Sequence, residues 1–228
     1  MKTALRTLCV AGLALFAWAG AAQAAPITAD LAGGGGTIAS PPGLTYDLGG
    51  GLVMTVTGHT HSGGGSGDSP FASLGNRDLH QDFEGLGVFG GGDENPDLDA
   101  GGADEMIRFS FNRKVNLISI VFDDIGVGNE EFDFAVDGVD QDVNGLLGTD
   151  SIALLPPGGV FGSDDYLADF TGDGLMGTVF DFYTDDTNDD YRLRRITVEA
   201  VSDVPEPAAL ALLGMGLAGL GFARRRRG

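Results

Sequence analysis

The chain has 228 residues, with 33 acidic and 13 basic residues and a formal net charge of −20 at pH 7. This length accommodates one ordinary domain plus processing segments, because domains cluster at about 100 to 200 residues. Residues 25–204 hold 7 basic and 32 acidic residues, a net charge of −25. Such a surface repels nucleic acid and anionic lipid, which excludes a nucleic-acid partner and favours the capture of cations.

Residues 1–24 have the composition of a secretory signal peptide. Two basic residues precede an apolar run over residues 8–19, and Ala22-Gln23-Ala24 has the small-x-small pattern that signal peptidase accepts. The run is shorter than the ~20 residues of a membrane-spanning helix, so an uncleaved anchor is the lesser alternative. We predict cleavage between Ala24 and Ala25. The single cysteine, Cys9, is lost with this leader, which excludes a disulfide scaffold and a thiol nucleophile in the mature domain.

The pattern of residues 25–203 predicts one all-β domain. Glycines and turn residues recur too often for an amphipathic helix, and short alternating apolar runs recur instead. Residues 25–84 are glycine-rich, with long loops expected at the glycine stretches 33–36 and 63–67, and residues 85–201 form the better-defined core. About nine to ten short strands favour an antiparallel β-sandwich or jelly roll.

The predicted strands include residues 52–57, 106–111, 115–122, 132–136, 152–155, 167–170, 178–183 and 191–201. Asn112-Arg113-Lys114 is expected to turn the chain between the second and third of these strands. In the last strand the apolar positions change phase after Leu193, which predicts a β-bulge near Arg194-Arg195.

Two acidic segments are candidate metal ligands. The first holds Asp93, Glu94, Asp97, Asp99, Asp104 and Glu105, and the second holds Asp185, Asp186, Asn188, Asp189 and Asp190. Ca²⁺ prefers oxygen ligands on a bendable loop, and carboxylates this close repel one another unless a cation shields them. We therefore predict calcium binding, at one site or at two, by Asp93, Asp97, Asp99, Asp104, Glu105, Asp186 and Asp189. The alternative is a pair of solvated acidic loops.

The histidines give a weaker metal signal. His59-Thr60-His61 would present two imidazoles on one face of a strand, as a pair of transition-metal ligands does. The third histidine, His80, is remote in sequence, and the flank after His61 is rich in Gly and Ser. An exposed loop is therefore the favoured interpretation. No G-x-S-x-G or H-E-x-x-H signature is present and no carboxylate pair stands out, so we predict that the protein is not an enzyme.

Residues 204–228 form a tail with three parts. Val204-Pro205-Glu206-Pro207 is followed by the uncharged, mostly apolar residues 208–223 and then by Arg224-Arg225-Arg226-Arg227. As a helix, residues 208–223 extend about 24 Å, which suffices to cross a slightly thinned bilayer. The arginines would stay in the cytoplasm and leave the acidic domain outside. The two prolines hold Glu206 extended, a conformation that the cleft of a processing enzyme can bind.

These three parts together resemble the PEP-CTERM sorting signal, which membrane transpeptidases of the exosortase family recognise in Gram-negative bacteria that make extracellular polysaccharide. The resemblance implies export to the cell envelope, transient anchoring in the membrane, and removal or exchange of the tail near Pro205 to Pro207. An ordinary tail anchor is the alternative. Residues 85–201 resemble the sandwich domains common among PEP-CTERM surface proteins, through Gly85-Leu86-Gly87-Val88 and Tyr191-Arg192-Leu193; most of those domains have no assigned activity.

The sequence thus predicts a noncatalytic protein of the cell surface or the extracellular biofilm matrix. Its expected partners are signal peptidase, an exosortase-type transpeptidase, the membrane and exopolysaccharide, and its expected cofactor is Ca²⁺. Two alternatives stay open: a glycan-binding module that acts on exopolysaccharide, and a carboxylate-dependent hydrolase. The single tryptophan, Trp18, is lost with the leader, which argues against sugar stacking.

Overall fold

A computed structural model describes residues 24–61, 75–90, 96–99, 104–123, 132–141, 152–154, 166–184 and 190–201. These ranges contain strands, turns and bends, and none of their residues is helical. Residues 25–201 form one compact unit. The prediction of an all-β domain is therefore confirmed.

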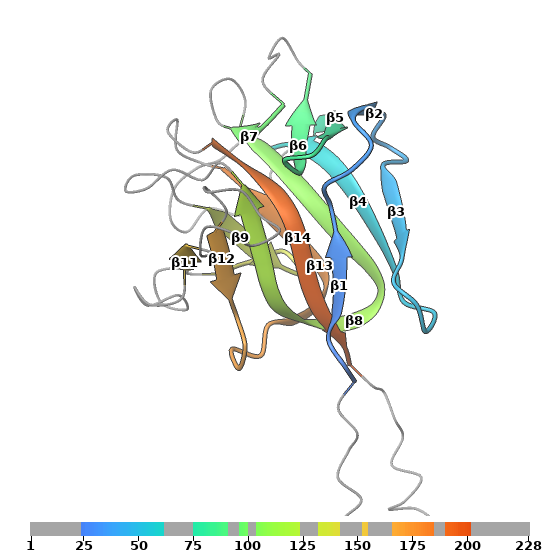
Figure 1. The fold of residues 1–228 in the computed structure, drawn as a ribbon, viewed down its shortest axis with the longest axis vertical. Coiled ribbons are helices and arrows are strands. Elements are labelled where there is room, and N and C mark those ends of the chain that lie inside the picture. Colours follow the sequence, from blue (N-terminus) through green and yellow to red (C-terminus); the bar gives the residue numbers. More distant parts are fainter. Residues whose placement is uncertain are drawn as a thin grey trace, which may run out of the picture. The chain divides into compact units, whose positions relative to one another are not determined.

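The strands, drawn in Figure 1, are β1 (Ile27–Asp30), β2 (Gly36–Ile38), β3 (Leu44–Asp47), β4 (Val53–Thr60), β5 (Gly75–Gln81), β6 (Leu86–Phe89), β7 (Leu98–Asp99), β8 (Glu105–Asp123), β9 (Asp133–Val136), β10 (Val139–Gln141), β11 (Ile152–Leu154), β12 (Tyr166–Asp169), β13 (Met176–Tyr183) and β14 (Asp190–Ala200).

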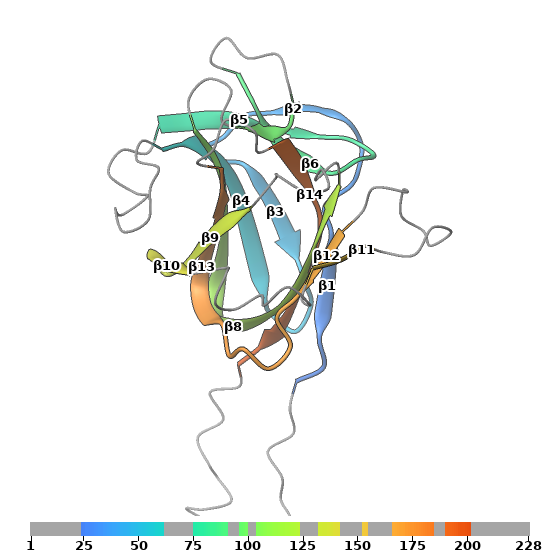
Figure 2. The same cartoon turned by 90° about the vertical axis from the view of Figure 1, so that its left-hand side faces the viewer.

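The sheet closes on itself in a barrel-like arrangement. β14 pairs with β6, β6 with β5, β5 with β4 and β4 with β8, and β8 returns to β14, all antiparallel. Figure 2 shows the strands curled around a common interior. Closure depends on β8, whose first half pairs with β4 and β13 and whose second half pairs with β14 and β12. The expected two-sheet sandwich is not confirmed, because this one long strand belongs to both sides of the sheet.

The turn expected at residues 112–114 is wrong, because β8 continues through them as a strand with their side chains exposed. The strand nevertheless bends here. Val115 lies opposite Gly177 on β13, whereas Ser110 lies opposite Val179, so the register against β13 jumps across this stretch. An exposed polar triplet between two buried runs therefore marks a corner within a strand rather than the end of one.

The β9–β10 hairpin fastens β13 where its register jumps. Asp137 and Gly138 form the two-residue turn with positive φ values of 49° and 79°, as an Asp-Gly hairpin requires. Asp137 Oδ1 accepts hydrogen bonds from the N–H groups of Thr178 and Val179, both at 2.9 Å, and from the Thr178 hydroxyl at 3.0 Å. Burial raises the pKa of Asp137, but these hydrogen bonds outweigh it and hold the pKa below its ordinary value.

The glycine-rich N-terminal part contains more strand than expected. Gly36, the last residue of the glycine stretch 33–36, begins β2, and β3 follows at Leu44–Asp47. Neither strand carries a fully buried side chain. β2 pairs with β5 and β3 with β4, and Ile38, Leu44 and Tyr46 pack against the core while staying partly exposed. The second glycine stretch, residues 63–67, lies outside the described residues.

The bulge predicted near Arg194-Arg195 is confirmed. Leu193 lies opposite Phe122 and Arg195 opposite Val121, so Arg194 is the extra residue of β14 against β8. The Arg194 carbonyl instead accepts a hydrogen bond from Leu31 N–H. The phase change in the apolar pattern was a reliable signal, because a one-residue slip moves every later side chain to the other face.

The interior is filled by aliphatic and aromatic side chains. Its largest fully buried members are Tyr191, Phe109, Phe122, Phe132, Phe134, Phe170, Phe180 and Phe182. Several of these rings meet edge to face, including Phe109 with Phe182 at a centroid distance of 5.8 Å. Met106, Ala135 and Tyr183 form a separate small apolar cluster.

Candidate functional site

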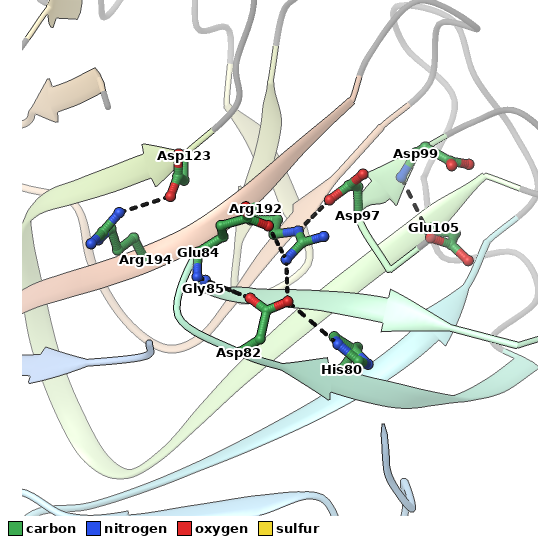
Figure 3. Close-up of polar contacts among 10 residues, drawn as sticks. All are labelled: His80, Asp82, Glu84, Gly85, Asp97, Asp99, Glu105, Asp123, Arg192 and Arg194. Carbon is green, nitrogen blue, oxygen red and sulfur yellow. Dashed lines mark hydrogen bonds and ion pairs between the residues drawn. The ribbon is translucent and has the colours of Figure 1, made fainter. Parts of the chain in front are cut away.

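The first residues of β14 carry a buried guanidinium that binds three carboxylates (Figure 3). Arg192 Nη1 lies 2.6 Å from Asp82 Oδ2 and 2.8 Å from Glu84 Oε2, and Arg192 Nε donates to Asp97 Oδ1. The side chains of Arg192 and Asp97 are only 8% and 9% exposed. Burial lowers the pKa of Arg192, but the hydrogen bonds to Asp82 and Asp97 outweigh burial and raise it. This network fastens the β5–β6 turn and the segment before β7 to β14.

A close approach of two backbones places Asp97 in this network. A Cβ atom on Gly87 of β6 would lie 1.8 Å from the carbonyl oxygen of Pro96, so no larger residue fits there. Val88 N–H donates to the Asp97 carbonyl at 3.4 Å. Burial raises the pKa of Asp82, but hydrogen bonds from Arg192 and from the backbone lower it below its ordinary value. Asp82 is thus held as an anion by Arg192 and by the backbone of its own turn.

The two acidic segments of the sequence meet beside this network. β7 pairs with the first residues of β14, and Asp99 lies opposite Asp190 in the register. Asp99 N–H donates to Oε2 of Glu105, the first residue of β8, at 3.4 Å. Asp97, Asp99 and Glu105 are buried. We call Asp97, Asp99, Glu105 and Asp190 the carboxylate end.

The carboxylate end holds part of the predicted calcium set. Asp99 and Glu105 come together there, and Asp104 directly precedes Glu105 in the chain. Asp97 is bound to Arg192 instead. Outside the described residues lie Asp93, Asp186 and Asp189. Within the described ranges, no group of three or more His, Cys, Asp or Glu side chains could hold a metal ion. Calcium binding therefore stays a prediction.

A second ion pair crosses from β8 to β13. Arg108 Nε lies 2.6 Å from Asp181 Oδ1, and Arg108 Nη2 lies 3.0 Å from Oδ2, a bidentate pair. The Asp181 side chain is fully buried and that of Arg108 is 25% exposed. Burial raises the pKa of Asp181 above its ordinary value, and Arg108 limits the rise. The pair lies on a strand face turned away from Phe109 and Phe182 of the main core.

The exposed-loop interpretation of His59-Thr60-His61 is wrong. His59 lies within β4, and His61 is only 3% exposed. His59 Nε2 lies 2.8 Å from Thr57 Oγ1, whereas His61 Nε2 donates to the Thr184 carbonyl at 3.0 Å. Burial and the nearby Arg108 lower the pKa of His59. The two Nε2 atoms thus bond to different groups instead of pointing toward one metal position.

Both ends of the described domain leave it side by side. Ile27 of β1 lies opposite Val198 of β14, and Val201 N–H donates to the Lys114 carbonyl at 3.1 Å. Figures 1 and 2 show the start of β1 and the end of β14 at the end of the sheet away from β5 and β6. The described domain therefore begins and ends at one place, and only residues 202 and 203 separate Val201 from Val204.

A family model for the PEP-CTERM protein-sorting motif matches residues 203–227. The chain carries a PEP-CTERM sorting motif. The match covers the three parts predicted from the sequence: the Val204 to Pro207 box, the apolar residues 208–223 and the arginines 224–227. No curated protein and no solved structure matches the chain.

The PEP-CTERM motif implies recognition by an exosortase and export in a Gram-negative bacterium. The residues that it matches lie outside the described ones, as do residues 1–23 of the predicted leader. In the part of the chain that the structure describes, no helix is long and apolar enough to cross a membrane. The membrane-spanning helix at residues 208–223 and the cleavage between Ala24 and Ala25 stay predictions.

Sequence reasoning missed the ion pairs that Arg108 and Arg192 form with buried carboxylates. A signal for them was present. Residues 25–204 contain only 7 basic residues, and these two arginines stand within predicted strands. An arginine inside a strand of so acidic a chain needs a carboxylate partner when it is buried. Which carboxylate it takes depends on pairing between distant segments and has no local signal.

Proposed function

We propose that this PEP-CTERM protein is a noncatalytic exported protein of the cell surface or extracellular matrix, sorted and processed by an exosortase-type transpeptidase. The sorting motif at residues 203–227 carries the proposal. The compact β unit extends to Val201, and the motif begins two residues later, at residue 203. After processing, residues 25–203 would be the part displayed outside the cell.

The contacts of the ionisable side chains support a noncatalytic role. Asp82 and Asp97 are engaged by Arg192, and Asp181 by Arg108. An acid or base catalyst must be able to exchange a proton with a substrate, whereas each of these carboxylates is bound by an arginine of the protein itself. The hydrogen bonds of His59 and His61 likewise go to the protein's own Thr57 and Thr184.

We expect the mature protein to begin at Ala25 and to end near Pro205 to Pro207 in a strain that has the transpeptidase. Mass spectrometry of the protein purified from its host, with and without that enzyme, measures both ends. In the enzyme-free strain the arginines 224–227 should remain. A chain that ends at Gly228 in both strains would mean a plain membrane anchor and would end the proposal of sorting by an exosortase.

The proposal includes calcium at the carboxylate end, because residues from both acidic segments come together there. We expect Ca²⁺ to raise the melting temperature of the mature protein and a chelator to lower it. A site filled to 100 times its dissociation constant adds about 2.7 kcal/mol to the free energy of unfolding. Asp99→Asn with Glu105→Gln should abolish the shift, while Asp47→Asn, an exposed carboxylate on β3, should retain it. An unchanged melting temperature with Ca²⁺ and with chelator would refute calcium binding.

Glycan binding is the second candidate, and one exposed ring favours it. Phe83, in the β5–β6 turn, is 74% exposed and stands between Asp82 and Glu84. An exposed aromatic ring beside carboxylates can stack on a sugar while the carboxylates accept hydrogen bonds from its hydroxyls. Calorimetric titration against the host's exopolysaccharide tests this candidate. The absence of both heat and retention on the polymer would eliminate it.

A further inference from the structure

At the end of the domain where β14 finishes, hydrogen bonds join several segments. The corner of β8 is tied to the β3–β4 turn: Asn112 donates to the Gly51 carbonyl at 2.9 Å, and Arg113 Nη2 donates to the Gly50 carbonyl at 3.2 Å. The carbonyl of Lys114, the next residue, binds Val201 N–H, the last described donor of the chain. Val201, the last residue that the structure describes, thus lies against this corner, and β14 ends at the lower end of the domain in Figures 1 and 2.

The sorting box follows the last described residue closely in the chain. Three peptide steps separate Val201 from Val204, and an extended chain advances at most about 3.3–3.6 Å per residue. The box therefore begins within about 11 Å of Val201. Pro205 and Pro207 keep the chain extended rather than coiled. An enzyme that holds the box in its cleft must have its own surface next to the β8 corner.

The groups on this surface suit a protein partner. Asn112, Arg113 and Lys114 are exposed, and Met176, which lies opposite Asn116 of β8, is 50% exposed. We call Asn112, Arg113, Lys114 and Met176 the exit surface. It places two exposed cations and an exposed apolar side chain together on a domain of net charge −25. Exposed arginine and methionine are enriched in protein interfaces.

Acidic groups near the exit surface argue against the lipid bilayer as its partner. Glu199 lies opposite Asn116 in the register, and Asp47 and Asp173 are exposed in the neighbouring β3 and β12–β13 segments. An anionic membrane attracts clusters of several basic residues, and a mixed surface with two cations and these carboxylates gains little from it. A protein surface with both charges and an apolar patch is the better complement.

We propose that the exit surface docks on the outward face of the sorting transpeptidase and holds the box at its catalytic cleft. This inference rests on the proposed function, since it names a second contact with the same enzyme. Docking through a short extended tether raises the effective concentration of the box at the cleft, and this gain is lost when the tether is long and flexible. The folded domain is then part of what the enzyme recognises, along with the motif.

The test is the rate of tail removal in the host, measured by pulse-chase on the full chain. The variant Arg113→Ser/Lys114→Ser/Met176→Ser should be processed about tenfold more slowly, as the loss of a small docking contact predicts. The matched control is Arg77→Ser/Phe83→Ser, which removes a cation and an exposed apolar side chain from the strands and turn at the other end of the domain. Equal melting temperatures confirm that both variants fold. Processing of the triple variant at the wild-type rate would overturn docking.

A flexible insertion between the domain and the motif distinguishes docking from steric obstruction of the enzyme by the folded domain. Six Gly and Ser residues inserted after Val201 should slow processing if the exit surface positions the box, and should remove most of the difference between the triple variant and the wild type. Faster processing with the spacer would mean that the folded domain only obstructs the enzyme, and docking would be wrong. If the wild-type tail is never removed, the proposed function itself fails, so the two failures are distinguishable.

Labelling of a single introduced cysteine tests whether the lipid bilayer, instead of the transpeptidase, covers the exit surface. The mature chain contains no cysteine, so Met176→Cys gives one reactive thiol, and Phe83→Cys gives a control away from the exit surface. A membrane-impermeant maleimide should label position 176 slowly only when a cleavage-inactive transpeptidase is present. Equal protection in cells without the enzyme would assign the exit surface to the lipid and overturn the proposal.

Discussion

Replacing Arg192 by alanine is expected to lower the free energy of unfolding by about 3–5 kcal/mol, because it leaves buried carboxylates without their cation. Asp97 is the main source of this cost, since its side chain is 9% exposed and cannot regain full hydration. Glu84, which is 42% exposed, turns to water and contributes little. We therefore expect a loss near the lower end of this range, measured by chemical denaturation of the mature protein.

Two further variants locate the cause. Arg192→Lys keeps the charge but cannot reach Asp82 and Asp97 with a planar fork, so it should recover only part of the loss. Arg113→Ala, at an exposed arginine of the β8 corner, should change the free energy of unfolding by less than about 0.5 kcal/mol. If Arg192→Ala were as stable as Arg113→Ala, the network would not hold the β5–β6 turn to β14.

Replacing Arg108 by methionine is expected to cost about 3 kcal/mol at pH 7 and much less in acid. Asp181 is fully buried, and its pKa already lies above its ordinary value of 3.8 through burial. Arg108 supplies the hydrogen bond and the charge that lower this pKa, so it rises further in the variant. The variant must therefore either bury an unpaired carboxylate at neutral pH or take up a proton.

The sign of the pH dependence follows from linkage. A carboxyl with a raised pKa in the folded protein binds its proton more tightly there than in the unfolded chain, so its contribution to stability is full below pH ~3.8 and is lost as the pH rises through the folded pKa. The deficit of Arg108→Met relative to wild type should therefore shrink on acidification from pH 7 toward pH 4. Denaturation curves across this range measure it.

The double variant Arg108→Met/Asp181→Leu provides the control. It removes both charges and fills the space with apolar groups, which often costs little or even stabilises. It should recover most of the stability at pH 7 and show no pH-dependent deficit from this site. A deficit of Arg108→Met that is the same at pH 4 and pH 7 would show that lost packing, and not the orphaned Asp181, is the cause.

Some features of this protein are local in the chain, and these could be predicted from the sequence. The PEP-CTERM motif depends on a box, an apolar run and terminal arginines that follow one another directly, and the family match covers all three. The strand at Asp190–Ala200 and its bulge at Arg194 showed themselves in the alternation of apolar side chains. That residues 25–228 contain no cysteine is likewise a property of composition.

Other features depend on segments far apart in the chain, and only the tertiary structure decided them. The partner of Arg192 is Asp97, 95 residues away, and the partner of Arg108 is Asp181, 73 residues away. Among 32 acidic residues, no local pattern marks these two. Strand pairing determines which carboxylate each arginine meets, because the antiparallel register fixes which side chains lie on the same face and opposite one another.

The same reason explains the errors at residues 112–114 and at the histidines. The exposed triplet has the composition of a turn, but the strand continues through it, and Asn112 and Arg113 form hydrogen bonds with the β3–β4 turn. The glycine-rich flank suggested that His61 is exposed, but pairing of β4 with β8 carries it into a buried position against the Tyr183 ring. Sequence alone determined the export and sorting signals and the all-β class, because those depend on neighbouring residues. Closure of the sheet, the ion pairs and the meeting of both ends of the described domain required long-range pairing, of β8 with β13 and β14 and of β1 with β14.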